Sequence, residues 1–160
     1  MNIISELQKL AQKKGYSLIR TEGMTLDAVQ ALLNYLKDDQ LLEEQYQYHL
    51  CEQTKSTIFI DQMPIATKQI EITNANILSV TVGSTGYMGG DTGHGGRTYF
   101  AIKDEASTDL RLRVNNGHWQ EVESIEIALG GDTELETFTE ALKFGLDQLS
   151  LIVREQVSDQ

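Results

Sequence analysis

The stretch GSTGYMGGDTGHGGR, residues 83–97, decides how the middle of the chain folds, and it holds seven of the 13 glycines in the 160-residue sequence. The segments on either side alternate apolar and polar residues, with Leu78, Val80 and Val82 before the stretch and residues 98–102 after it. This period of two is typical of β-strands. We therefore predict two antiparallel strands joined by a loop of about fourteen residues, far longer than an ordinary hairpin connection.

The same period of two occurs in the part of the chain that precedes this hairpin. Ile58 and Ile60 are two residues apart, and so are Ile70 and Ile72. Pro64 lies between them, and because proline cannot donate a ladder hydrogen bond, its strand is expected to start late or to lie at a sheet edge. The middle of the chain is thus predicted to form a sheet.

A second hairpin follows, and its register can be predicted from its side chains. We expect a three-residue loop, Asn115-Asn116-Gly117, with Gly117 at positive φ. The resulting cross-strand pairs are Leu110 with Val122, Val114 with His118, Arg111 with Glu121, and Arg113 with Trp119. After Val122 the apolar parity shifts, which predicts a bulge near residues 123–124.

Helical spacing of apolar residues marks both ends of the chain. One helix is expected from residue 3 to the basic residues before Gly15, and a second is expected from a Thr25 cap to about residue 45. Near the C-terminus, Gly130-Gly131 predicts a strand-to-helix corner, with Asp132 or Thr133 capping a long helix that includes residues 135–153.

Together these segments predict one α+β domain over residues 1–160. The sheet is expected to be mainly antiparallel, with about five or six strands. Two helices precede the sheet, and the long C-terminal helix packs on it.

The chain is acidic, with a formal net charge of −11, and residues 101–160 hold 13 of the 24 acidic groups. A field of this sign repels phosphate backbones, and because the sequence has no basic stripe, direct nucleic-acid binding is not expected. Cys51 is the single cysteine, and the first residues lack the features of a signal peptide. No apolar segment approaches the roughly 18 residues of a membrane span. We therefore expect a cytoplasmic protein without a membrane role.

Clustered glycines in residues 83–97 are compatible with three kinds of chemistry. The first is phosphate binding, because glycines free backbone N–H groups to form an anion nest and Arg97 can neutralise charge. A P-loop ending at Gly96 would, however, need Gly in place of Asp91 and Lys in place of Arg97. Residues 98–102 also indicate a strand, so no helix N-terminus follows the loop.

The second interpretation is catalysis or metal binding by Asp91, His94 and Arg97, since Asp and His three residues apart can ligate one ion and His carries protons near neutral pH. The fold would have to bring His49 or His118 close to extend this group, and no established metal or nucleophile motif is present. His49 and Cys51 are also possible metal ligands, although a single pair is more typical of structural residues.

The third interpretation is a binding loop, in which glycines let the backbone approach a partner while Tyr87, Met88, His94 and Arg97 supply contacts. A purely structural alternative is a compact series of turns packed on the sheet. Trp119, beside Arg113, is expected to form a cation–π pair on the sheet surface.

We therefore predict a non-enzymatic intracellular protein that binds a protein partner or small ligand through the glycine-rich loop 83–97, without cofactor or metal. The predicted contact residues are Tyr87, Met88, Asp91, His94 and Arg97. An open sheet edge would also permit a homodimer. Two alternatives stay open: a small hydrolase or a metal- or phosphate-binding enzyme centred on Asp91, His94 and Arg97, and an acidic nucleic-acid mimic, of the kind mobile elements encode, that inhibits a basic protein.

Overall fold

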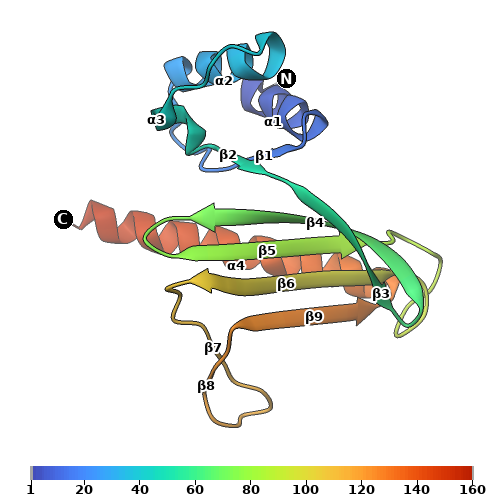
Figure 1. Ribbon diagram of the computed structural model, residues 1–160. Coiled ribbons are helices and arrows are strands. Elements are labelled where there is room, and N and C mark those ends of the chain that lie inside the picture. Colours follow the sequence, from blue (N-terminus) through green and yellow to red (C-terminus); the bar gives the residue numbers. More distant parts are fainter. Residues whose placement is uncertain (1, 160) are drawn as a thin grey trace. The chain divides into compact units, whose positions relative to one another are not determined.

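The computed structural model describes residues 2–159 and shows an α+β fold (Figure 1). The four helices are α1 (Ile3–Lys13), α2 (Leu26–Asp38), α3 (Glu44–Gln47) and α4 (Asp132–Ser158). The nine strands are β1 (Tyr16–Leu18), β2 (Leu50–Glu52), β3 (Thr54–Ile60), β4 (Met63–Thr73), β5 (Ile77–Ser84), β6 (Arg97–Ala106), β7 (Arg111–Leu112), β8 (Gln120–Glu121) and β9 (Ser124–Gly130).

Five of the strands form the main antiparallel sheet, in the order β3-β4-β5-β6-β9 (Figure 1). The pairs β1–β2 and β7–β8 form two small antiparallel sheets. The predicted fold class is therefore confirmed, with helices near the N-terminus, a five-stranded sheet and a long C-terminal helix. Pro64 is the second residue of β4, in agreement with a proline near a strand start.

The N-terminal helices bury a small apolar core. Its buried members are Leu7, Ala11, Val29, Leu32, Leu36 and Leu42. As predicted, α1 ends before Gly15, and Thr25 caps α2 by accepting a hydrogen bond from the Ala28 N–H. The prediction that this second helix continues to about residue 45 is wrong. It ends at Asp38, because Asp39 adopts a left-handed conformation (φ 51°) that stops the helical hydrogen-bond pattern.

The β7–β8 hairpin has the predicted register, with Arg111 opposite Glu121 and Leu112 opposite Gln120. The predicted positive φ at Gly117 is wrong. Asn115 and Asn116 adopt the left-handed conformation instead, with φ values of 50° and 58°. Asparagine tolerates this region better than most residues, so two asparagines can make the turn. The expected irregularity also occurs, because β8 ends at Glu121 and β9 begins only at Ser124.

Contacts within the chain divide it into two compact units. The first contains residues 1–55, 68–81 and 102–125, and the second contains residues 56–67, 82–101 and 126–160. Strands β3, β4, β5, β6 and β9 each continue from one unit into the other, and the single domain over residues 1–160 stays a prediction. Among residues 2–159, no helix combines the length and the apolar character that a bilayer crossing requires.

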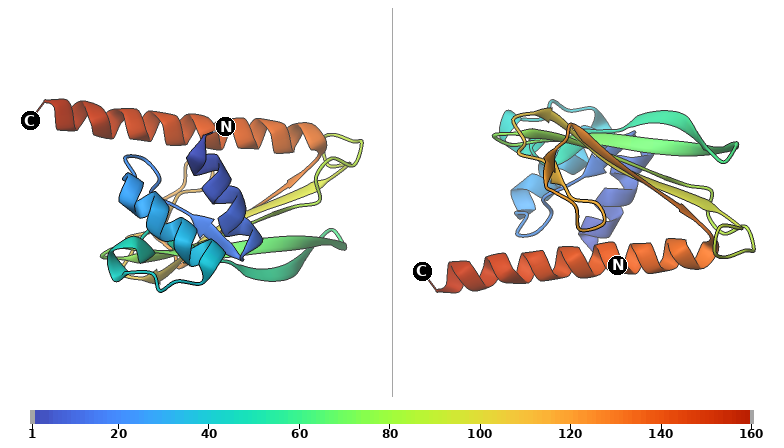
Figure 2. Two further views of the ribbon diagram at one scale, coloured as in Figure 1. Left: turned by 90° about the horizontal axis from the view of Figure 1, so that it is seen from above. Right: turned by 90° about the horizontal axis from the view of Figure 1, so that it is seen from below.

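In the second unit, α4 packs against β6 near the glycine-rich loop (Figure 2). The rings of Phe100 and Phe138 meet edge to face, with centroids 5.8 Å apart. Farther along the helix, Leu146 and Leu149 are exposed. The first turns of α4 therefore adjoin both the sheet and the loop that connects β5 to β6.

Candidate functional site: the glycine-rich loop

The connection between β5 and β6, residues 85–96, is an ordered loop whose backbone depends on glycine. Gly86, Gly89, Gly93 and Gly95 all have positive φ. At Gly95 the requirement is also steric, because a Cβ atom there would overlap the Gly90 carbonyl oxygen. The glycines are therefore needed for the course of the loop itself.

The N–H groups of this loop converge on one carboxylate, that of Asp132 at the first position of α4. It accepts hydrogen bonds from the amides of Met88 (3.0 Å), Gly89 (2.7 Å), Gly90 (3.3 Å) and Gly96 (3.1 Å). These donors favour the charged carboxylate, led by the Met88 and Gly96 amides, and lower the pKa of Asp132. The clustered amides therefore form an anion nest, and the anion bound in it is the carboxylate of Asp132, a residue of the same chain.

This arrangement corrects the prediction for the start of α4. Gly131 occupies the N-cap position, and the Asp132 side chain binds the loop amides. The sequence predicts Asp132 or Thr133 as the cap, and neither side chain caps the helix. The four loop N–H groups satisfy more of the acceptor capacity of Asp132 than one helix amide would.

Two further carboxylates join the loop to α4. Asp91 Oδ1 accepts hydrogen bonds from the N–H (2.8 Å) and the hydroxyl (2.7 Å) of Thr133. Glu134 Oε1 accepts one from the Thr92 N–H (2.9 Å), while its Oε2 is buried without a hydrogen-bond partner among the described residues. The loop and the first turn of α4 thus form one hydrogen-bonded structure.

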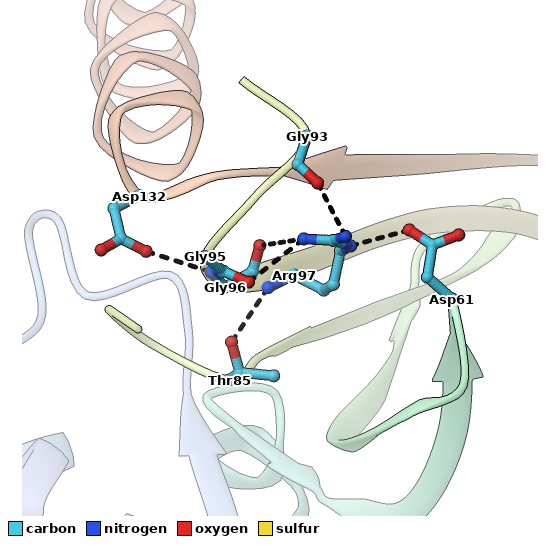
Figure 3. A network of polar contacts seen from close by, with 7 residues as sticks. All are labelled: Asp61, Thr85, Gly93, Gly95, Gly96, Arg97 and Asp132. Atoms are coloured by element: carbon cyan, nitrogen blue, oxygen red, sulfur yellow. Dashed lines mark hydrogen bonds and ion pairs between the residues drawn. The ribbon is translucent and has the colours of Figure 1, made fainter. Parts of the chain in front are cut away.

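Arg97, the first residue of β6, holds the loop carbonyls (Figure 3). It is 8% exposed. Its Nη1 donates to the carbonyls of Gly95 and Gly96 (both 3.1 Å), its Nη2 donates to Gly93 O (2.9 Å), and its Nε pairs with Asp61 Oδ2 (2.8 Å). A buried cation therefore organises the loop carbonyls, while Asp132 organises its amides.

Tyr87 and Met88 extend from this framework, with 64% and 58% of their surface exposed. The Tyr87 hydroxyl forms a hydrogen bond with Glu136, which raises the pKa of Tyr87. His94 is also exposed, and its backbone N–H donates to Asp91 O (3.1 Å). Of the five residues predicted for the site, four thus lie at the loop surface and Arg97 lies beneath it.

Three residues that close the loop were not among the predicted site residues: Asp61, Asp132 and Glu134. The first lies in the β3–β4 turn, and the others follow Gly130-Gly131. A signal for Asp132 was available, because a cluster of glycine amides needs an acceptor and an acidic residue at a helix start is a natural one. Nothing in the sequence near Asp61 indicates Arg97 as its partner.

A separate groove of about 590 Å³ in the first unit adjoins Arg20, Tyr48 and Cys51. The Arg20 guanidinium lies 4.0 Å from the Tyr48 ring centroid and donates to the Thr73 carbonyl (2.8 Å). Cys51 Sγ donates to Glu71 O (3.3 Å), and burial raises the pKa of the thiol. The guanidinium, the aromatic ring and the thiol beside this groove thus have partners within the first unit.

One further side-chain prediction is confirmed. The predicted cation–π pair is present, with the Arg113 guanidinium 5.9 Å from the Trp119 ring. Within residues 2–159, no group of three His, Cys, Asp or Glu side chains could hold a metal ion.

No family model, curated protein or solved structure matches this chain. A function for the chain has to be argued from the chemistry of its own residues, because a fold class is compatible with many activities. The glycine-rich loop offers the most specific chemistry, since its conformation is fixed and two of its largest side chains remain exposed.

Proposed function

We propose that this is a non-enzymatic binding protein whose glycine-rich loop presents Tyr87 and Met88 to a protein partner. The observation that carries the proposal is the exposure of both side chains, 64% and 58%, on a loop whose backbone is held by internal hydrogen bonds. A loop that served only to pack on its own sheet would bury its two largest apolar side chains.

The framework lowers the free-energy cost of binding. The N–H groups of Met88, Gly89 and Gly90 are bonded to Asp132, so the backbone that carries Tyr87 and Met88 is held before a partner arrives. Association normally loses free energy when loops and side chains become ordered, and a pre-organised loop avoids part of that loss. Tyr and Met are also enriched at protein interfaces.

The shape of the site favours a protein partner over a small ligand. Small-molecule sites are concave and enclose most of the ligand surface. Tyr87 and Met88 protrude, and neither lines the groove beside α4 or the groove near Arg20. We therefore expect the partner to supply an apolar pocket that these side chains enter.

The enzymatic alternative has less geometric support. The Asp91 carboxylate is bonded to Thr133, whereas the Arg97 guanidinium is bonded to Asp61 and to loop carbonyls. Among the described residues, these two side chains share no hydrogen-bond partner. The buried Arg97 guanidinium is bonded to the loop itself and does not face a substrate site. A catalytic centre would require Asp91, His94 and Arg97 to meet around one reacting group.

Affinity capture with matched variants tests the proposal. The immobilised protein is compared with the double variant Tyr87→Ser/Met88→Ser, and Phe59→Ser is the control because Phe59 is an equally exposed apolar residue (70%) on β3. We expect a protein that the wild type and the control retain and the double variant loses, with unchanged circular dichroism for all three. Equal capture of every partner by the three proteins would refute a role for the loop.

A further inference from the structure

The C-terminal half of α4 carries a continuous line of exposed apolar side chains. Its members are between 43% and 68% exposed: Leu142, Leu146, Leu149, Val153 and Val157. Successive residues of an α-helix are rotated by about 100°, so these five side chains lie within about 80° of one another around the helix axis. These five residues are the α4 stripe. A stripe of this kind differs from the single apolar residues that any monomer exposes, and it is typical of an interaction surface.

The segment that carries the α4 stripe is electrically neutral, unlike the chain as a whole. Residues 142–158 contain two cations, Lys143 and Arg154, and two anions, Asp147 and Glu155. The whole chain has a net charge of −11, which makes two copies repel each other. At this neutral segment a second copy can approach with little of that repulsion. A lipid surface is a poorer match, because helices that lie on membranes have a polar face rich in Lys and Arg.

The α4 stripe is almost symmetrical about Leu149. Leu146 lies three residues before it and Val153 four residues after it, while Leu142 lies seven before and Val157 eight after. A twofold axis near Leu149 therefore brings Leu146 opposite Val153 of a second copy and Leu142 opposite Val157 of that copy. The stripe is thus complementary to itself when the two helices run in opposite directions, as a twofold interface requires.

We propose that the α4 stripe pairs with the α4 stripe of a second copy of this chain, with the two helices antiparallel. The pair covers the apolar side chains of both copies at once, which is the favourable term in most protein association. It lies beyond Phe138, so Phe138 keeps its contact with Phe100 of β6. The stripe does not include Tyr87 or Met88, so the inference does not rest on the proposed function.

The acidic start of α4 favours the antiparallel pair over a parallel one. A parallel pair would place Asp132 and Glu134 of the two copies side by side, where their like charges repel. In the antiparallel pair each first turn lies about 25 Å from the twofold axis, at 1.5 Å per residue, so the two acidic turns are about 50 Å apart. Charges at that distance are screened at physiological ionic strength.

Sedimentation of the full chain tests whether the copies associate. One helix pair makes a small interface, so protein concentrations from about 1 to 200 μM are appropriate. Monomers of 17.9 kDa should convert into dimers as the concentration rises. Monomers throughout this range would overturn the inference, since the stripe would then be covered by something else or remain exposed.

Matched variants show whether the α4 stripe is the contact surface. Leu146→Ser/Leu149→Ser should raise the dissociation constant at least about tenfold. Phe144→Ser/Leu151→Ser is the control, because both residues are exposed (67% and 46%) but point to the opposite side of the same helix. The control should dimerise as the wild type does, with the same circular dichroism for all three proteins. Equal weakening by the two double variants would mean non-specific association and would overturn the inference.

Cysteine cross-linking determines the direction of the helices. Leu142→Cys and Val157→Cys are made separately in a Cys51→Ser background. The two positions are about 22 Å apart along one helix, far beyond the reach of a disulfide. A mixture of the two proteins should therefore form a covalent dimer on mild oxidation, and neither protein should do so alone. Cross-linking of each protein alone would mean a parallel pair and would overturn the proposed arrangement.

Vesicle binding examines the lipid alternative directly. The wild type should remain in the supernatant when vesicles of phosphatidylcholine and phosphatidylglycerol are sedimented. If it instead sediments with them as a monomer, and Leu146→Ser/Leu149→Ser does not, the stripe binds lipid and the inference is overturned.

Discussion

Replacing Arg97 with methionine should destabilise the second unit strongly, because the guanidinium is the common donor for the loop carbonyls. Arg97 is 8% exposed and donates to Gly93 O, Gly95 O and Gly96 O. Methionine keeps much of the side-chain length and supplies no N–H donor. The Gly96 carbonyl keeps the Gly131 N–H as a donor (2.8 Å), so the variant leaves the carbonyls of Gly93 and Gly95 to find water or to remain unpaired.

The magnitude follows from these bonds. A hydrogen-bonding group left unsatisfied costs about 1 kcal/mol at the lower end of its range, so the two carbonyls give about 2 kcal/mol. The ion pair with Asp61 adds little, because the Asp61 side chain is 67% exposed and water can replace its partner. At about 2–4 °C per kcal/mol for a chain of this length, the melting temperature should fall by about 4–8 °C.

Urea unfolding followed by far-ultraviolet circular dichroism measures this effect, since α4 alone contributes 27 helical residues to the signal. Asp61→Asn is the control and should lose at most about 0.5 kcal/mol. Arg97→Lys should fall between the two, because an ammonium group cannot reproduce the planar fork of donors. If Asp61→Asn is as harmful as Arg97→Met, the ion pair stabilises the loop and the carbonyl argument is wrong.

Three further outcomes follow from the loop and from the buried thiol. The amides around Asp132 lower its pKa in the folded protein. The stabilisation that the Asp132 carboxylate supplies should therefore be complete above the ordinary Asp pKa of about 3.9, and it should be lost as the pH falls through the lower pKa of the folded state. In an NMR titration the loop amide signals should shift in the wild type but not in Asp132→Asn. Gly95→Ala should destabilise the protein more than Gly93→Ala in the same urea assay, because both have positive φ but only the Gly95 Cβ overlaps another backbone group; equal losses would contradict this. Cys51 should react with iodoacetamide more slowly than a free thiol at pH 8, because burial raises its pKa, and a rate equal to that of free cysteine would show that the thiol is not shielded.

Elements whose pattern is local could be predicted from the sequence. The register of the β7–β8 hairpin follows from the complementarity of Arg111 with Glu121, and the start of α2 follows from Thr25 as a cap. The end of α2 could not be predicted in this way, because apolar residues continue beyond Asp38 and only the backbone of Asp39 shows where the helix stops. Periodicity predicts which face is buried more reliably than where an element ends.

The closure of the glycine-rich loop depends on partners that are distant in sequence. The pattern of glycines predicts an anion nest, and Asp91 and Arg97 are recognisable as charged groups within it. Sequence spacing does not reveal that the anion is Asp132, or that Arg97 turns inward to Asp61. The hydrogen bonds that close this possible ligand site are therefore made by residues distant in the sequence.

The distance along the chain between the loop and Asp132 has a consequence for synthesis. The bonded amides precede this carboxylate by 36 to 44 residues. A ribosome that has translated β5 and β6 has therefore released a strand pair whose connection still lacks its acceptor. Until residue 132 emerges, Tyr87 and Met88 lie in a glycine-rich loop that lacks its hydrogen bonds to Asp132. A nascent chain that stalls before this point should therefore be cleaved readily by proteases at the tip of this hairpin.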